Sequence, residues 1–209
     1  MGVIPRVVLT FLALSGIANA RELAQLGPLR ASAGEAVSGY LEVPALGDNG
    51  ARIPVSLVRG TDKGPVLVLV AGTHGYEYPG ISALQRLRQS IDPRALRGTL
   101  ILVHIANPPS FYGRTIYTSP ADGKNLNRVF PGRPDGTLSE RIAYAITTQV
   151  ISQADFLVDL HAGDGNEALR PYVYMSVTGD AQLDAATRGM ALAFGLDHIV
   201  IDAARIRPH

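Results

Sequence analysis

Two histidines of this chain follow directly on apolar runs, and a glutamate accompanies the first of them. His74 and Glu77 stand three residues apart after the run at residues 66–71, and His161 ends the run at residues 156–160. A hydrolytic zinc ion is commonly held by three histidine or carboxylate side chains, with the fourth position open for water. We therefore predict that His74, Glu77 and His161 bind one Zn²⁺ ion per chain.

Neighbouring residues could orient these side chains. Gly72 and Gly75 allow the backbone to turn sharply on both sides of the first histidine. Asp159 and Asp164 flank the second histidine, and either could accept a hydrogen bond from a ligand imidazole. The alternative for both aspartates is a turn cap. His104 lies inside an apolar run and is expected to be a core residue.

The elements that must position these residues are short apolar runs that alternate with amphipathic stretches. The expected strands are residues 66–71, 100–105, 156–160, 172–177 and 199–202, after a hairpin that turns at 47–50 between 40–43 and 53–58. The expected helices are residues 79–91, 139–153 with Ser139 as the cap, and 180–194. This alternation predicts an α/β sandwich with a mixed, largely parallel sheet. Ligands of such sheets bind at the carboxyl ends of strands, where both histidines lie.

The stretch at residues 107–136 is rich in proline, glycine and asparagine and has no periodicity. Loops of this length in compact domains usually carry function. Asn127 and Arg128 are adjacent within it, and a guanidinium beside an amide suits recognition of a carboxylate. Arg114, farther upstream, could polarise a carbonyl group near the metal. The alternative for each arginine is a solvated surface position.

The first 20 residues differ in kind from the rest. Arg6 supplies a positive charge, residues 7–17 an apolar core, and residues 18–20 a small-x-small cleavage signal, which is the pattern of a secretory signal peptide. A core of about 11 residues is too short for an uncleaved anchor, which needs ~20 to span a bilayer. We predict cleavage after Ala20, export to the periplasm or beyond, and a catalytic domain at residues 21–209 without a stable membrane anchor.

The composition limits which partners the chain can bind and which side chains can coordinate a metal. The chain has 209 residues, about the size of one domain, and a formal net charge of +1, which does not indicate a nucleic-acid partner. It has no cysteine, which excludes disulfides and thiolate zinc ligands. Histidine, glutamate and aspartate must therefore supply any metal coordination.

Three motifs occur in order along the chain, at residues 73–80, 122–132 and 159–161. Together they resemble the signatures of the succinylglutamate desuccinylase/aspartoacylase family, which belongs to the zinc-carboxypeptidase-like enzymes. The resemblance covers roughly residues 66–177. It implies an α/β/α sandwich around a mixed sheet and one zinc ion held by the His, Glu and His ligands already named. It also implies that Asn127 and Arg128 hold a substrate carboxylate and that Arg114 assists the carbonyl.

Two features depart from the pattern of that family. Residues 117–124 look like an insertion, which places Arg114 farther ahead of Asn127. The general-base glutamate of the family lies well downstream of the third ligand, and Glu167 is the only glutamate after His161. Glu167 lies in a turn, where a surface position is expected. We therefore expect the chain to be truncated at its C-terminus, without its general base, and to hydrolyse substrate only weakly.

The leading hypothesis is zinc-dependent hydrolysis of an amide bond in a small substrate with a free carboxylate, such as an N-acyl amino acid. Export favours instead a carboxypeptidase or peptide amidase that acts on short or cell-wall peptides. The missing base leaves a third hypothesis, a non-catalytic module that keeps the zinc fold and binds carboxylate-bearing peptides. An activity screen of acyl amino acids against short peptides distinguishes the first two.

Overall fold

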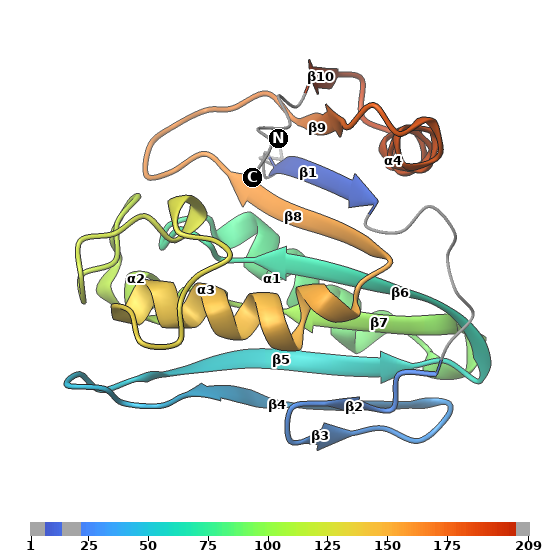
Figure 1. Cartoon of the computed structure of the whole chain (residues 1–209). Helices are drawn as coiled ribbons and strands as arrows, with labels where there is room; N and C mark the ends of the chain where they lie inside the picture. The colour runs from blue at the N-terminus through green and yellow to red at the C-terminus, as the bar shows by residue number, and fades with distance from the viewer. Residues whose placement is uncertain (1–6, 14–21, 204–209) are drawn as a thin grey trace.

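The computed structural model describes residues 7–13 and 22–203 of the chain. Its centre is an eight-stranded mixed sheet (Figure 1). The strands follow one another across the sheet in the order β10 (Ile199–Ala203), β9 (Tyr172–Val177), β1 (Val7–Ala13), β8 (Phe156–Ala162), β6 (Asp62–Ala71), β7 (Arg97–Val103), β5 (Ala51–Arg59) and β4 (Glu35–Val43). The short strands β2 (Gln25–Leu26) and β3 (Leu29–Arg30) form a separate antiparallel pair.

Helices and short 3-10 turns connect the strands. The helices are α1 (Tyr78–Ser90), α2 (Pro108–Gly113), α3 (Leu138–Gln149) and α4 (Ala181–Ala193), and the 3-10 turns are η1 (Pro93–Ala95), η2 (Leu126–Arg128) and η3 (Ile151–Gln153). Strand β6 pairs in parallel with both β7 and β8, whereas β5 pairs in antiparallel fashion with both β4 and β7. The predicted mixed sheet and the predicted hairpin between β4 and β5 are confirmed.

The sheet carries a buried apolar cluster on each face. One cluster joins Val68 of β6 to Ile142 and Ile146 of α3, and the other joins Leu160 of β8 to Ile81 of α1. Figure 1 shows α3 in front of the sheet and α1 behind it. Because both faces are covered, the central strands are continuous apolar runs without strict alternation. The implied α/β/α sandwich is thus confirmed.

The start of the helix predicted at residues 139–153 was wrong. The helix begins at Leu138 with Thr137 as its N-cap, and the Thr137 backbone N–H donates to the Glu140 carboxylate at 2.8 Å. This is the reciprocal capping pattern of a threonine followed three residues later by glutamate. Ser139 lies inside the first turn, where its hydroxyl donates to Asp122 at 2.8 Å. The helix ends at Gln149, and η3 follows it.

The segment predicted to be a signal peptide is only partly described. Residues 1–6 and 14–20 lie outside the described residues, and Val7–Ala13 form β1 between β8 and β9. Removal of residues 1–20 would take this strand out of the sheet and leave β8 and β9 without the partner between them. Cleavage after Ala20 and export stay predictions. No helix in the described ranges is long and apolar enough to span a bilayer.

His104 belongs to a polar network on the α1 side of the sheet. Its Nε2 atom lies 2.7 Å from the Ser56 hydroxyl, which lies 2.8 Å from the Ser38 hydroxyl, and Arg88 Nε donates to Ser38 at 3.2 Å. Burial and the positive charge of Arg88 lower the pKa of His104. Its Nδ1 atom has no hydrogen-bond partner among the described residues, so a proton there would be buried and unpaired. His104 is therefore held neutral. It is only partly buried, so the expected core position is confirmed in part.

This neutral histidine makes stability depend on pH. In the unfolded chain a histidine binds a proton at about pH 6.5, whereas His104 in the folded chain binds one only at lower pH. The unfolded state therefore takes up more protons, and the free energy of unfolding should fall as the pH drops below about 6.5. Urea unfolding at pH 7.5 and 5.5 measures the difference. A His104→Gln variant should show a smaller difference than the parent, and an unchanged one would contradict the assignment.

Candidate metal centre

The centre is built where two neighbouring strands end. Strands β6 and β8 run in parallel, and Ala71 of β6 lies opposite Leu160 of β8. The chain leaves β6 through Gly72, whose φ of 70° favours glycine, and carries His74 over the edge of the sheet. Glu77 is the N-cap of α1, so the helix fixes its position. His161 is the penultimate residue of β8 and lies at the same edge.

The structure brings together the three residues predicted to bind metal. His74 Nδ1 lies 2.9 Å from Glu77 Oε1, and His161 Nδ1 lies 2.9 Å from Glu77 Oε2. One ligand atom from each residue can be chosen so that all lie within 4.8 Å of one another. His74 and Glu77 are buried, with 7% and 3% of their surfaces exposed. Two imidazole nitrogens and one carboxylate are the ligand set of many catalytic zinc sites.

The second nitrogen of each histidine is also held. His161 Nε2 lies 2.8 Å from Asp159 Oδ2, and His74 Nε2 lies 3.1 Å from Asn125 Oδ1. Each acceptor oxygen favours a proton on Nε2, so Nδ1 is the nitrogen that faces the shared centre and can bind a metal ion once it has lost its own proton. Asp159 is one of the two aspartates considered for this contact. Asn125 was missed, although it lies inside the second motif, because nothing in the sequence pairs it with a histidine 51 residues away.

The charges around the centre favour a cation. Although burial opposes it, hydrogen bonds from His161 and His74 lower the pKa of Glu77, which keeps its carboxylate ionised. Burial also opposes a charged His161, but the Asp159 and Glu77 carboxylates raise its pKa to about 10. Two carboxylates therefore hold positive charge between them, supplied by the protonated imidazole. Because a bound metal ion takes the place of such protons, these residues fit a divalent cation.

A second aspartate and two loop residues border the same centre. Asp164 is 3% exposed, and its Oδ2 atom lies 4.0 Å from His74 Nδ1. Burial and the nearby Glu77 raise its pKa to about 6. Glu167 accepts the Asp164 backbone N–H at 3.2 Å and the Tyr117 hydroxyl at 2.7 Å. Glu167 is exposed as predicted, yet it links the two loops that flank the centre.

The other predicted site residues are linked to the three ligand residues less directly. The Asn127 backbone N–H donates to Asn125 Oδ1 at 2.9 Å, so Asn127 is one hydrogen bond from the residue that holds His74. Arg128 is exposed, and its guanidinium donates to the Asn127 carbonyl at 3.1 Å. Arg114 is the exposed C-cap of α2, and in the described part of the chain its guanidinium makes no hydrogen bond or ion pair. The role predicted for Arg114 therefore stays a prediction.

Known proteins are similar to this chain in both sequence and fold. The model of the succinylglutamate desuccinylase/aspartoacylase catalytic domain matches residues 63–205. Over 168 residues the chain is 37% identical to N-alpha-acetyl-L-2,4-diaminobutyric acid deacetylase of Halomonas elongata, which covers 78% of this chain and 48% of the deacetylase. An aspartoacylase family protein from Mesorhizobium loti has 29% identity and a TM-score of 0.65, over 81% of this chain and 54% of that protein.

A third relative extends the comparison. The succinylglutamate desuccinylase/aspartoacylase from Rhodobacter sphaeroides has 27% identity and a TM-score of 0.63, over 79% of this chain and 52% of that protein. The chain thus spans about half the length of these relatives. The family model nevertheless matches well over half of this chain, and the folds agree. The chain therefore belongs to the succinylglutamate desuccinylase/aspartoacylase family, whose members hydrolyse amide bonds.

Proposed function

We propose that this chain forms the zinc-binding part of a hydrolase that removes the acyl group from an N-acyl amino acid. The observation that carries the proposal is the convergence of His74 Nδ1, His161 Nδ1 and the Glu77 carboxylate, with both Nε2 atoms already held by other residues. The Halomonas elongata relative is a deacetylase of an N-acetylated amino acid, which supports this reaction class over other amide hydrolyses.

Each residue of the site has a part in that reaction. A zinc ion bound at this centre would polarise the scissile carbonyl and lower the pKa of water towards about 7. Asp159 and Asn125 hold the two imidazoles in the orientation that metal binding requires. Asn127 and Arg128 lie in η2, which begins directly after Asn125, and would present an amide and a guanidinium to the substrate carboxylate. The carboxylate contact would fix the acyl carbonyl beside the metal.

Metal removal tests the proposal. The zinc-loaded chain should release the amino acid from an N-acetyl amino acid, because all three ligands are present. Chelation should abolish the release, and added zinc should restore it. Amine release measured by chromatography, with Glu77→Gln as a variant that loses one ligand oxygen, gives the result. Hydrolysis that continues in the metal-free protein, or that is unaffected by Glu77→Gln, would contradict a zinc-dependent deacylase.

Arg128→Ala should weaken binding of N-acetylalanine by about 1.5–3 kcal/mol, the usual value of a hydrogen bond to a charged group. Arg128→Lys should restore only part of the lost affinity, because an ammonium group keeps the charge but cannot form the two-pronged contact. Titration calorimetry with N-acetylalanine and with its carboxamide measures both. The carboxamide has no carboxylate and should bind parent and variant equally.

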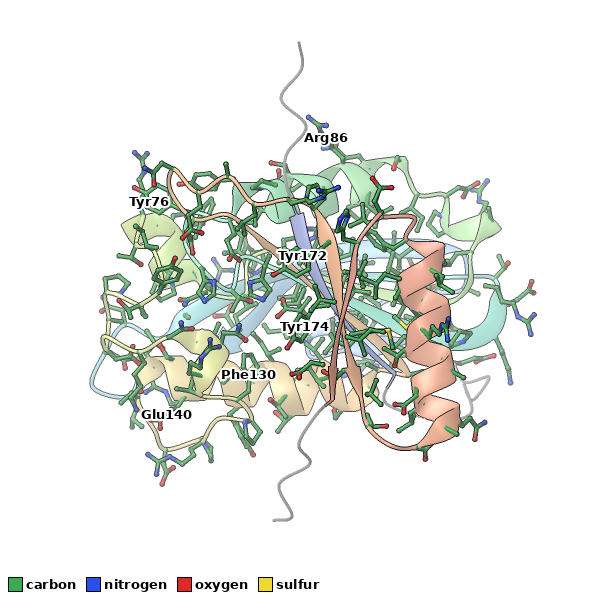
Figure 2. The ribbon with its side chains drawn as sticks, turned by 90° about the horizontal axis from the view of Figure 1, so that it is seen from above. Tyr76, Arg86, Phe130, Glu140, Tyr172 and Tyr174 are labelled. Atoms are coloured by element: carbon green, nitrogen blue, oxygen red, sulfur yellow. The ribbon has the colours of Figure 1, made fainter. Side chains whose placement is uncertain are left out.

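Arg86→Ala is the matched control for this measurement. Arg86 is an exposed arginine of α1, and Figure 2 shows it far from Phe130, which lies two residues after Arg128. Its removal should leave both affinities unchanged. An equal loss in Arg86→Ala and Arg128→Ala would mean that general charge, and not a specific contact, attracts the carboxylate.

A further inference from the structure

A pocket of about 410 Å³ opens beside the metal centre, on the α3 side of the sheet. Its volume lies in the range of ligand pockets, about 300–1,000 Å³. Val70 of β6 and Leu157 of β8 line it from the sheet, and Ile146 of α3 and Ile151 of η3 line it from the helical layer. Phe130, labelled beside α3 in Figure 2, adds an aromatic wall. Apolar side chains therefore form most of the pocket.

The pocket is continuous with the proposed site. Thr73, Asn127 and Asp159 also line it. Thr73 immediately precedes His74, and Asp159 accepts the hydrogen bond from His161. The pocket therefore begins at residues that touch the metal ligands and at the amide proposed to bind the substrate carboxylate.

The depth of the pocket can be measured along β8. Leu157, Asp159 and His161 share one face of the strand, because side chains alternate along it. Asp159 is thus the residue nearer the metal end, and Leu157 lies about 7 Å farther from it, at roughly 3.3 Å per residue. A chain of about five carbon–carbon bonds, each about 1.5 Å long, fits that depth.

The charge of the pocket lining restricts the kind of side chain that can enter. Among the described residues that line the pocket, Asp159 is the one that carries a charge, and it is negative. An acidic side chain that entered the pocket would meet this carboxylate and would lose its water without gaining a cationic partner. An aliphatic side chain would instead remove the apolar walls from water.

We propose that this pocket receives the side chain of the amino acid half of the substrate and selects aliphatic side chains over acidic ones. The assignment rests on the proposed function, since Asn127 at the entrance would hold the carboxylate on the same α-carbon. It implies that N-acyl derivatives of residues such as norleucine are better ligands than those of aspartate or glutamate.

Binding to the metal-free full chain tests the selection without hydrolysis. Titration calorimetry compares N-acetylnorleucine, N-acetylalanine and N-acetylglutamate. Each methylene buried in the pocket contributes about fourfold to affinity, so the three extra methylenes of norleucine should give about sixtyfold tighter binding than alanine. N-acetylglutamate should bind no more tightly than N-acetylalanine. Equal affinities for norleucine and alanine, tighter binding of glutamate than of norleucine, or no binding of any of the three would overturn the proposal.

Two adjacent threonines of α3 provide a matched pair of variants. Thr147 lines the pocket, whereas Thr148 is exposed and its hydroxyl donates to the Tyr144 carbonyl. Thr147→Trp should fill the pocket and remove the advantage of norleucine over alanine. Thr148→Trp should preserve the sixtyfold ratio. If both variants keep the ratio, the side chain does not enter this pocket.

A third variant tests the proposal if the Thr147→Trp protein does not fold. Thr147→Lys introduces a cation and should raise the affinity for N-acetylglutamate at least tenfold relative to the parent, an order-of-magnitude expectation for one new charge-assisted contact. An unchanged glutamate affinity in a folded Thr147→Lys protein would overturn the proposal.

A turnover assay with the zinc-loaded chain separates this inference from the proposed function. Hydrolysis of all three compounds without a preference would support the deacylase and defeat the pocket assignment. The calorimetric preference without hydrolysis of any compound would support the pocket and defeat the deacylase.

Discussion

A His161→Ala variant is expected to lose stoichiometric zinc binding. The parent should bind about one zinc ion per chain, with the ligand atoms at ~2.0–2.2 Å from it. His161 supplies one of the three ligand atoms, and its removal also leaves the Asp159 carboxylate without the imidazole that it contacts at 2.8 Å. Loss of a residue that only supports a ligand costs about 10–100-fold in metal affinity, so loss of the ligand itself should cost more than about 100-fold.

Competition with a chromophoric zinc chelator measures these affinities. Asp159→Asn should fall in the 10–100-fold range, because it weakens the support of His161 and leaves the ligand in place. His198→Ala is the matched control, since His198 is an exposed histidine between α4 and β10. If His161→Ala retained zinc as tightly as the parent, the ligand assignment would be wrong.

The ligand set could be predicted because two physical rules act on residues close in sequence to strand ends. The runs before His74 and His161 are apolar and rich in branched residues, which predicts buried strands. Parallel strands of one sheet end at the same edge, where β6 and β8 indeed lie side by side. These rules predict that both histidines lie at one edge of the sheet, and the structure adds that their strands are neighbours. The N-cap Thr137 could also be predicted from the sequence, because Glu140 follows it at the spacing of a capping box.

Contacts between distant loops could not be predicted in the same way. Asn125 and His74 are 51 residues apart, and Tyr117 and Glu167 are 50 apart. Loops have no periodicity that fixes which side chains meet, so only the folded chain reveals these pairs. The apolar segment Val7–Ala13 shows a different limit. A run of branched apolar residues suits both the core of an export signal and a buried strand, and composition alone does not choose between them.

Gly75→Ala should be among the most destabilising single changes in this chain. A Cβ atom at Gly75 would collide with the backbone carbonyl oxygens of Ser110, within α2, and of Thr115, just after it. Backbone atoms cannot rotate away as a side chain can, so the turn or the helix must shift. Overpacking of this kind costs about 1–3 kcal/mol, and contact with two backbone atoms places the expected loss at about 3 kcal/mol. The turn carries both His74 and Glu77, so zinc affinity should fall with stability.

Urea unfolding of the metal-free protein and chelator competition measure the two effects separately. Gly189→Ala is the control with the opposite expected sign. Gly189 lies inside α4, and an added Cβ there meets nothing within 4 Å. Alanine is favoured over glycine in a helix by about 1 kcal/mol, so this variant should be more stable than the parent. A Gly75→Ala protein as stable as Gly189→Ala, with parental zinc affinity, would show that the end of α2 does not hold the metal-binding turn in place.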